Sequence, residues 1–289
     1  MPAIGFRCPN GDAVKFNECL NGNCGHRCMA LPALNAVEKS THHWFGKPSV
    51  TTLLKPTRQT YLEIKENYFI SPFGATASMI GTSMHAIMEQ SVPQNWLSEV
   101  RLSDDITSGA FDAYDMKTQT LWDYKNFGAY VVAREIGMTS KWEKRVITRG
   151  KRKGQEEWKQ TYAMGGVKHV HDVAWQMNYY RILMEKHGIP VKHMKVQVFV
   201  RGALDATAKR YGLTQTAYII PINPISDHWV RLYFKTKYDR LMHALEHDEI
   251  PPVCKRTERW DTSKSYPDRR CRDYCSVNKF CPYYKERYE

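Results

Sequence analysis

The stretch Gly109-Ala-Phe-Asp-Ala-Tyr-Asp-Met-Lys-Thr-Gln-Thr-Leu-Trp-Asp-Tyr-Lys-Asn126 predicts a β-hairpin that brings acidic side chains together. Two short runs with aromatic or β-branched residues flank a polar turn around Asp115 to Gln119. Because side chains two apart in a strand share a face, Asp123 and Lys125 point the same way. If Asp112 lies opposite Asp123, the two carboxylates lie on one face with Cβ atoms about 5 Å apart.

Two like charges at that distance repel each other, and a divalent cation between them would turn the repulsion into attraction. Lys125 would then lie beside the ion. Two carboxylates, a metal ion and an adjacent ammonium group are what phosphodiester hydrolysis needs. The alternative is an ordinary solvated Asp-x-Lys pair, which is common by chance and contributes little.

Composition and charge indicate a nucleic-acid partner. The chain has 289 residues, 42% of them hydrophobic, so it can bury a sizeable core as one large domain with appended modules. A formal net charge of +12 and a pI near 9.2 favour a polyanion, nucleic acid before an anionic membrane. The sequence contains no apolar run of about 18 residues and no signal-peptide core. We therefore expect a soluble cytoplasmic protein of a bacterial or phage-infected cell.

Eight cysteines form two sets, which in such a compartment indicates metal or cluster ligation rather than disulfides. The N-terminal set has ten, four and three residues between successive members and consists of Cys8, Cys19, Cys24 and Cys28. It predicts a zinc site, because a module this small cannot be stabilised by a hydrophobic core alone. Four free thiols are the alternative. The C-terminal set has spacings of sixteen, three and five residues and suits zinc or an iron-sulfur cluster equally: Cys254, Cys271, Cys275 and Cys281.

The remaining patterns predict an α/β fold on a mixed sheet flanked by helices. The elements we expect are short helices over Ser49 to Leu54 and Thr57 to Ile64, a buried helix over Ala75 to Glu89 that carries His85, a strand at Tyr130 to Ala133, a helix over His169 to His187, a strand over Met194 to Val200, a helix over Leu204 to Tyr211, a strand over Thr216 to Ile222, and a long helix over Trp229 to His247.

A basic stretch from Lys141 to Gln155 has Trp142 and Trp158 near its ends. Basic residues with aromatic neighbours suit a DNA backbone, and a plain solvated loop is the alternative. The candidate DNA contacts are Lys144, Arg145, Arg149, Lys151, Arg152 and Lys153.

From Ser49 to Cys281 the sequence resembles the RecB-type nucleases of the PD-(D/E)XK superfamily, which include the CRISPR-associated adaptation nucleases and the nuclease domain of AddAB helicase-nucleases. The resemblance rests on five parts in the family order: His85 in Gly-Thr-Ser-Met-His, Asp112 in Gly-Ala-Phe-Asp, the Asp123-Tyr-Lys125 signature, Gln176-Met-Asn-Tyr-Tyr180, and a terminal cysteine cluster around Arg-Asp-Tyr-Cys-Ser-Val. It implies a restriction-endonuclease-like core over 47–250, between Cys-rich segments over 1–46 and 251–289.

The resemblance also implies metal-dependent cleavage of DNA. The implied ligands of Mg²⁺ or Mn²⁺ are His85, Asp112, Asp123 and the backbone carbonyl of Tyr124. Lys125 would orient or help activate the attacking water. Gln176 and Tyr180 would steady Lys125 and the DNA strand.

The cysteine pattern departs from the family in one respect. Members with a [4Fe-4S] cluster have one cysteine before the His motif and three near the C-terminus, whereas Pro56 stands at the matching N-terminal position here. Cys254 would take its place, leaving the N-terminal set for a separate zinc ion. The rival arrangement combines one N-terminal cysteine with Cys271, Cys275 and Cys281.

We therefore expect a DNA exonuclease of recombination, repair or phage DNA metabolism, with a single-strand annealing protein or a helicase as candidate partner. A CRISPR spacer-processing nuclease is the alternative enzyme. The alternative of a different class is a zinc or iron-sulfur DNA-binding accessory protein whose acidic hairpin is inert.

Overall fold

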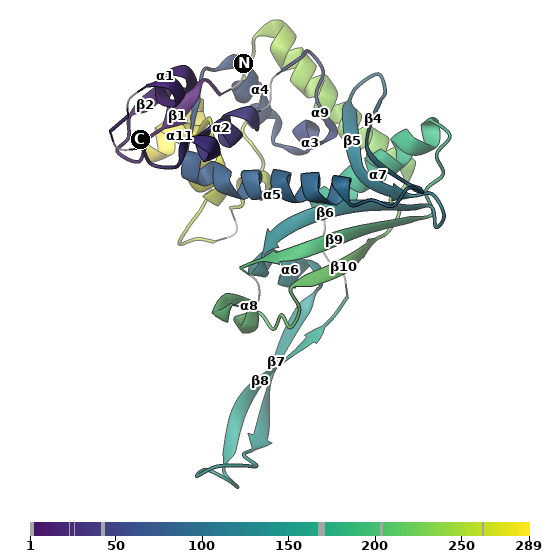
Figure 1. The fold of residues 1–289 in the computed structure, drawn as a ribbon. Coiled ribbons are helices and arrows are strands. Elements are labelled where there is room, and N and C mark those ends of the chain that lie inside the picture. The colour runs from purple at the N-terminus through teal and green to yellow at the C-terminus, as the bar shows by residue number, and fades with distance from the viewer. Residues whose placement is uncertain are drawn as a thin grey trace. The chain divides into compact units, whose positions relative to one another are not determined.

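A computed structural model describes residues 3–289 except 23, 26, 42–43, 167–170, 203–204 and 262. The chain divides into two compact units. The first comprises Met1–Gln90, Arg101–Ala110 and Ser226–Glu289, and the second comprises Ser91–Val100 and Phe111–Ile225. The predicted class is confirmed, because the fold is α/β with mixed sheets flanked by helices (Figure 1).

The main sheet has five strands in the order β10-β9-β6-β5-β4. Strands β6 and β9 are parallel, whereas β10 pairs antiparallel with β9 and β5 pairs antiparallel with β6. The strands are β4 (Trp96–Ser103), β5 (Ser108–Asp115), β6 (Thr120–Gly128), β9 (His193–Arg201) and β10 (Ala217–Ile222). All but the ends of β4 and β5 that flank their connection lie in the second unit. The predicted acidic hairpin is thus confirmed as β5–β6.

Alternation places one face of β9 in the core, with Met194, Val196, Val198 and Val200 buried. Helix α7 (His171–Lys186) packs near β6 and buries most of its residues from Val173 to Met184. It matches the predicted helix from residue 171 onward, and residues 169 and 170 lie outside the described part. The predicted helix near Leu204 is α8 (Ala206–Arg210), whose first turn Asp205 caps by accepting a hydrogen bond from the Ala208 N–H.

The strand expected at Tyr130 to Ala133 is wrong, because this segment lies in helix α6 (Ala129–Glu135). The neighbouring valines suggested a strand, but the buried positions are Ala129, Val132, Ala133 and Glu135. That is helical spacing, and it lets α6 pack against β6 and β9.

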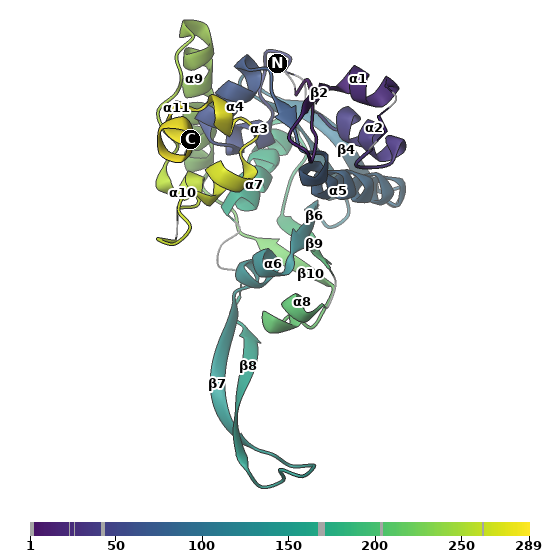
Figure 2. The same cartoon turned by 90° about the vertical axis from the view of Figure 1, so that its left-hand side faces the viewer.

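The basic stretch is not a simple loop. Its residues form the distal part of β7 (Met138–Val146) and the turn that connects β7 to β8 (Glu156–Met164), and the two strands pair antiparallel over nine residues each. Figures 1 and 2 show this two-stranded ribbon extending away from the strands of the second unit.

The N-terminal part of the first unit has a small sheet in the order β2-β1-β3 and a small core formed by Phe6, Cys19, Leu34 and Val37. Its elements are β1 (Gly5–Arg7), β2 (Ala13–Lys15), α1 (Phe16–Asn21), α2 (Leu31–Lys39), β3 (Phe69–Ile70) and α5 (Pro72–Gln90). At Gly5 a Cβ would lie 2.2 Å from the Val14 carbonyl oxygen, so only glycine allows this approach of β1 to β2.

The helix expected over Ala75 to Glu89 exists as α5, but its predicted burial is wrong. Pro72 is its one buried residue among those described, and Phe73 and Ile87 are 52% and 59% exposed. Apolar residues surround the helix, yet only the side with Ala75 and Met79 packs against the N-terminal core.

The rest of the first unit contains α3 (Val50–Leu54), α4 (Thr57–Lys65), α9 (Asp227–His247), α10 (Arg256–Arg259), a π-helical turn (Arg270–Tyr274), a 3-10 turn (Asn278–Phe280) and α11 (Pro282–Tyr288). Helices α3, α4 and α9 confirm the predicted elements and contact one another. Ser49 caps α3 by accepting a hydrogen bond from the Thr52 N–H. Of the described helices, none has the length and apolar character needed to cross a membrane.

Candidate active site

The acidic hairpin of the second unit brings three of the predicted catalytic side chains together. The observed register pairs Tyr114 with Leu121 and Ala113 with Trp122, and Asp112 and Asp123 are the next residues along β5 and β6. The Tyr124 N–H donates a 2.7 Å hydrogen bond to Asp112 Oδ2, and Lys125 Nζ lies 2.7 Å from Asp123 Oδ1.

Burial makes this cluster electrostatically strained. Asp123 is 2% exposed, and its Oδ2 has no hydrogen-bond partner among the described residues. Burial and the neighbouring Asp123 carboxylate raise the pKa of Asp112 to about 8, although Lys125 and the Tyr124 N–H oppose the rise. Burial disfavours charge on Lys125, but Asp123 and Asp112 outweigh it and raise the pKa of this ammonium group.

An acceptor oxygen that is buried without a partner is costly, and so is a pair of close carboxylates. A divalent cation would relieve both, because hard cations take carboxylate oxygens. The residues present therefore fit the predicted Mg²⁺ or Mn²⁺ ion, with Asp112, Asp123 and the Tyr124 carbonyl as the groups that the hairpin can offer.

Helix α7 contributes the predicted Gln176 and Tyr180, which are 7% and 6% exposed. The Gln176 amide donates a 3.4 Å hydrogen bond to Asp123 Oδ1, the oxygen that Lys125 also contacts. Gln176 thus holds the Asp123 carboxylate in place, and Tyr180 lies one helical turn further along α7.

Two acidic residues near the cluster were missed from the sequence. A carboxylate oxygen of Glu99, on β4, lies within 4.8 Å of one of Asp112. Glu99 also has a φ of 50°, a left-handed backbone conformation that is strained for a glutamate and that is concentrated at functional sites. Only the fold places this strand next to β5, so the sequence carries no local signal for Glu99.

The second missed residue is Glu135, at the end of α6. It is 4% exposed, and its Oε2 has no hydrogen-bond partner among the described residues. Burial raises the pKa of Glu135 to about 7; nearby Asp172 adds to the rise, whereas Arg134 and Lys125 oppose it. The wrong strand assignment concealed it, because only helical spacing turns position 135 inward.

The predicted ligand His85 is on α5 of the first unit and partly exposed. Its metal role stays a prediction of the sequence. The candidate DNA contacts from Lys144 to Lys153 lie on the β7–β8 ribbon and its turn, and those in the turn are exposed to solvent.

The four C-terminal cysteines line one cavity of the first unit, with Pro56 and Arg58 in the same wall. Arg58 donates a 3.6 Å hydrogen bond to Cys281 Sγ. Burial raises the pKa of Cys271 to about 11 and that of Cys275 to about 12, with Cys254 adding to both. A bound cation would be needed to hold these groups as thiolates at neutral pH.

Sulfur spacing bears on what this cavity could hold. Four thiolates around one zinc ion would lie about 3.8 Å from one another, given a Zn–S distance of about 2.3 Å. Among the described residues, no three cysteine sulfurs lie within 4.8 Å of one another. This holds for both cysteine sets, so the sulfur positions do not separate zinc from an iron-sulfur cluster at either of them.

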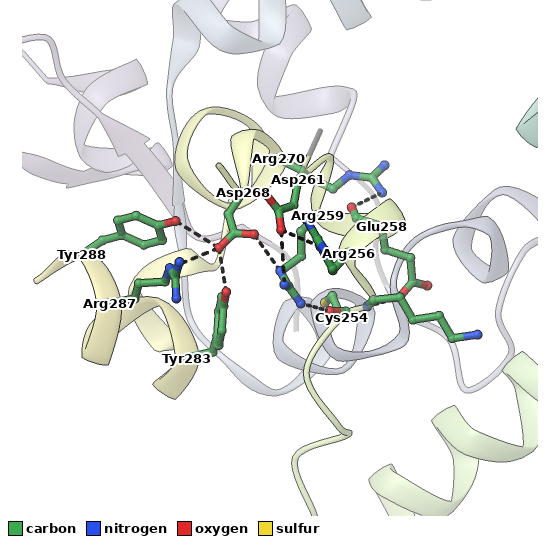
Figure 3. A network of polar contacts seen from close by, with 11 residues as sticks. Cys254, Arg256, Glu258, Arg259, Asp261, Asp268, Arg270, Tyr283, Arg287 and Tyr288 are labelled. Atoms are coloured by element: carbon green, nitrogen blue, oxygen red, sulfur yellow. Dashed lines mark hydrogen bonds and ion pairs between the residues drawn. The ribbon is translucent and has the colours of Figure 1, made fainter. Parts of the chain in front are cut away.

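A buried carboxylate organises the segment that carries these cysteines (Figure 3). Asp268 is 1% exposed and accepts hydrogen bonds from Tyr283 at 2.6 Å, Arg259 at 2.8 Å and Tyr288 at 3.0 Å. Burial would raise the pKa of Asp268, but these three donors outweigh it and lower the value. Arg259 also donates to the Cys254 carbonyl, which ties the network to the cysteine cavity.

The N-terminal cysteines gather around the β1–β2 turn, α1 and the loop before α2. Cys19 is buried in the small core, and Cys28 packs against it. Burial raises the pKa of Cys8 and Cys19, and the neighbouring thiols, including Cys24 and Cys28, add to both shifts. A zinc ion here would require the sulfurs to draw closer together than they are.

No protein-family model matches this chain, and no curated protein or solved structure is detectably similar to it.

Proposed function

We propose that this protein is a metal-dependent DNA nuclease with a restriction-endonuclease-like core of the PD-(D/E)XK type, acting as an exonuclease. The observation that carries the proposal is the cluster of the buried Asp123 with the partly buried Asp112 and Lys125 on one hairpin. Its strained carboxylates and unpartnered oxygen favour a divalent cation, and its ammonium group lies beside them. The net charge of +12 favours DNA as the substrate.

In this proposal Asp112, Asp123 and the Tyr124 carbonyl hold Mg²⁺ or Mn²⁺, with His85 as the further ligand that the family resemblance implies. When bound, the ion supplies Lewis acidity and lowers the pKa of a bound water. Glu99 is close enough to Asp112 to accept a hydrogen bond from that water or to add an oxygen ligand.

Lys125 has the central role among the side chains. Asp123 fixes its ammonium group at 2.7 Å and the surrounding carboxylates keep it protonated. A fixed cation can donate hydrogen bonds to the attacking water and to the phosphate oxygens, whose negative charge grows in the transition state. Gln176 fixes Asp123 in turn, and Tyr180 from the same helix would steady the strand.

The cysteine sets would serve as structural centres in this proposal. Cys254, Cys271, Cys275 and Cys281 line one cavity and would hold the [4Fe-4S] cluster that the family resemblance implies for the C-terminal cysteines. The N-terminal cysteines would hold a zinc ion that stabilises a module with a very small core.

The test is cleavage of linear and covalently closed DNA with Mg²⁺ or Mn²⁺. Wild type is compared with Lys125→Ala and with the matched control Lys117→Ala, which removes an exposed lysine from the turn of the same hairpin. We expect wild type and Lys117→Ala to degrade linear DNA only, and Lys125→Ala to be inactive while still folded. Equal activity of all three proteins, or DNA binding without cleavage by any, would exclude this active site and favour the DNA-binding accessory protein.

A further inference from the structure

The β7–β8 ribbon of the second unit has two chemically different faces. Because opposed residues in an antiparallel pair share a face, the pairs Trp142–Gln160 and Lys144–Trp158 define one face and the residues between them define the other. The first face carries the apolar and aromatic side chains Met138, Trp142, Val146, Trp158, Tyr162 and Met164. The second carries mainly charged and polar ones.

The aromatic face is open to solvent. Trp142 and Trp158 are each 62% exposed, and Met164 is 64% exposed. Large aromatic side chains normally bury most of their surface, and a two-stranded ribbon on its own is marginally stable in water. Such a face is typical of a surface that a partner covers.

The root of the ribbon is nevertheless well anchored within its unit. The Tyr162 ring packs so closely on Gly212 that a Cβ there would lie 2.3 Å from it, and the Tyr162 hydroxyl donates a 2.8 Å hydrogen bond to the Arg210 carbonyl. At Gly137, which has a φ of 65°, a Cβ would lie 2.1 Å from the Gly166 carbonyl oxygen. These contacts hold the base of the ribbon, and its two tryptophans lie beyond them and stay exposed.

Charge identifies the kind of partner. Residues 138–164 contain eight basic and three acidic residues, a net charge of +5, and the turn Arg149-Gly-Lys-Arg-Lys153 contains no acidic residue. Lys144 Nζ lies 5.8 Å from the centre of the Trp158 ring and 3.0 Å from Glu156 Oε2, an exposed ion pair that a phosphate can replace. Positive charge interleaved with exposed aromatic rings is the pattern that binds single-stranded nucleic acid.

We propose that the β7–β8 ribbon is a single-stranded DNA-binding element in which bases stack on Trp142 and Trp158 and the phosphates follow Lys144 and the basic turn. The choice of DNA rests on the proposed function, but the binding does not require the active site. In duplex DNA the base faces are stacked on one another and cannot stack on the tryptophan rings. The ribbon would therefore bind single strands more tightly than duplexes.

The experiment measures binding of a fluorescein-labelled oligothymidylate and of a labelled duplex by the full-length protein in EDTA, where metal-dependent cleavage cannot proceed. The test variant is Trp142→Ala/Trp158→Ala. The matched control is Trp229→Ala, which removes a tryptophan of similar exposure, 59%, from α9. We expect the double variant to bind the single strand roughly 30- to 20,000-fold more weakly, from the stacking energy of two bases, and the control to bind like wild type.

Two further variants separate stacking from charge. Trp142→Phe/Trp158→Phe keeps flat aromatic faces and should restore most of the affinity. Replacing Arg149, Lys151, Arg152 and Lys153 by glutamine should weaken single-strand and duplex binding alike and flatten the salt dependence, because phosphate contacts do not depend on base exposure.

Three results for the alanine double variant would overturn the proposal: wild-type affinity for the single strand, an equal loss of affinity for duplex and single strand, or a change of oligomeric state in place of a change in affinity. The last would show that the face packs against a second copy of this chain. Weak binding by the double variant together with absent cleavage by wild type would support the ribbon while refuting the nuclease, so the two failures are distinguishable.

Discussion

Replacing Asp112 by asparagine should stabilise the metal-free protein while abolishing cleavage. The Asp112 carboxyl is partly buried beside Asp123, and its pKa is raised from 3.8 to about 8 by burial first and by Asp123 second. Asparagine has nearly the same shape, and its side-chain oxygen can still accept the hydrogen bond from the Tyr124 N–H. The substitution therefore removes the charge and leaves the geometry.

The size and sign of the effect follow from linkage. Below about pH 4 the carboxyl is protonated in both states. Between about pH 4 and pH 8 the folded protein keeps a proton that the unfolded chain has lost, so the free energy of unfolding falls by up to about 1.4 kcal/mol per pH unit. The loss reaches at most about 5 kcal/mol at pH 8. Solvent screening of the partly exposed carboxyl reduces this loss of stability. We therefore expect Asp112→Asn to raise the free energy of unfolding at pH 8 by about 1–3 kcal/mol.

The assay is urea unfolding in EDTA at pH 5 and pH 8, followed by tryptophan fluorescence. Asp112→Asn should be more stable than wild type at pH 8, and the difference should shrink about threefold at pH 5. The control Asp105→Asn changes an exposed aspartate between β4 and β5 and should have little effect. At pH 8 Mg²⁺ or Mn²⁺ should stabilise wild type, by about 2.7 kcal/mol at a hundredfold excess over Kd, but not Asp112→Asn. If Asp112→Asn is no more stable than wild type at pH 8, or is more stable by the same amount at both pH values, the reasoning is refuted.

Three other predictions concern the cysteine sites and the support of Asp123. Metal analysis should find that Cys254→Ala loses iron but keeps zinc, and that Cys24→Ala does the reverse; unchanged iron in Cys254→Ala would overturn the C-terminal assignment. Asp268→Asn tolerates the left-handed backbone at this position, where φ is 52°, but leaves the partly buried Arg259 without its nearest counter-ion, with Asp261 at 4.0 Å as the remaining one. We expect it to lower the free energy of unfolding by about 2–4 kcal/mol in urea titrations and to reduce iron content, and an unchanged midpoint would contradict the role of the network. Gln176→Met removes the amide donor to Asp123 and should slow cleavage without abolishing it, while circular dichroism shows a retained fold; wild-type rates would exclude a positioning role.

The elements that the sequence predicted well share one property: their buried residues recur at the spacing of their own secondary structure. Strand β9 buries every second residue from Met194 to Val200, and the hairpin β5–β6 buries Leu121 and Asp123 on one face. The polar turn between Asp115 and Thr120 then fixed a register that pairs Ala113 with Trp122, and the adjacent Asp112 and Asp123 lie close enough to interact electrostatically. Periodicity and turn-forming residues depend only on neighbouring positions, so the sequence alone reveals them.

The elements that were missed depend on contacts that the sequence does not display. Strands β7 and β8 are exposed over most of both faces, so their burial has no period that would have distinguished them from a basic loop. Helix α6 was assigned as strand because paired valines favour strands, and packing against β6 and β9 overrode that preference. Glu99 reaches the site only because β4 lies next to β5 in the sheet. Glu135 reaches it only because α6 packs against β6 and β9.

The electrostatics of the hairpin argue against an inert ion pair. A structural Asp–Lys pair at the surface would be solvated on both sides, and a buried one would have its oxygens satisfied by donors. Here Asp123 is buried with one oxygen unpartnered among the described residues, and the neighbouring Asp112 carboxyl has its pKa raised to about 8, first by burial and then by Asp123. Such a cluster lowers the stability of the metal-free protein, and proteins break local rules of this kind mainly at functional sites. A divalent cation removes the repulsion, provides the unpartnered oxygen with a ligand bond and leaves Lys125 free to bind a phosphate, so the same charges that strain the fold would drive the chemistry.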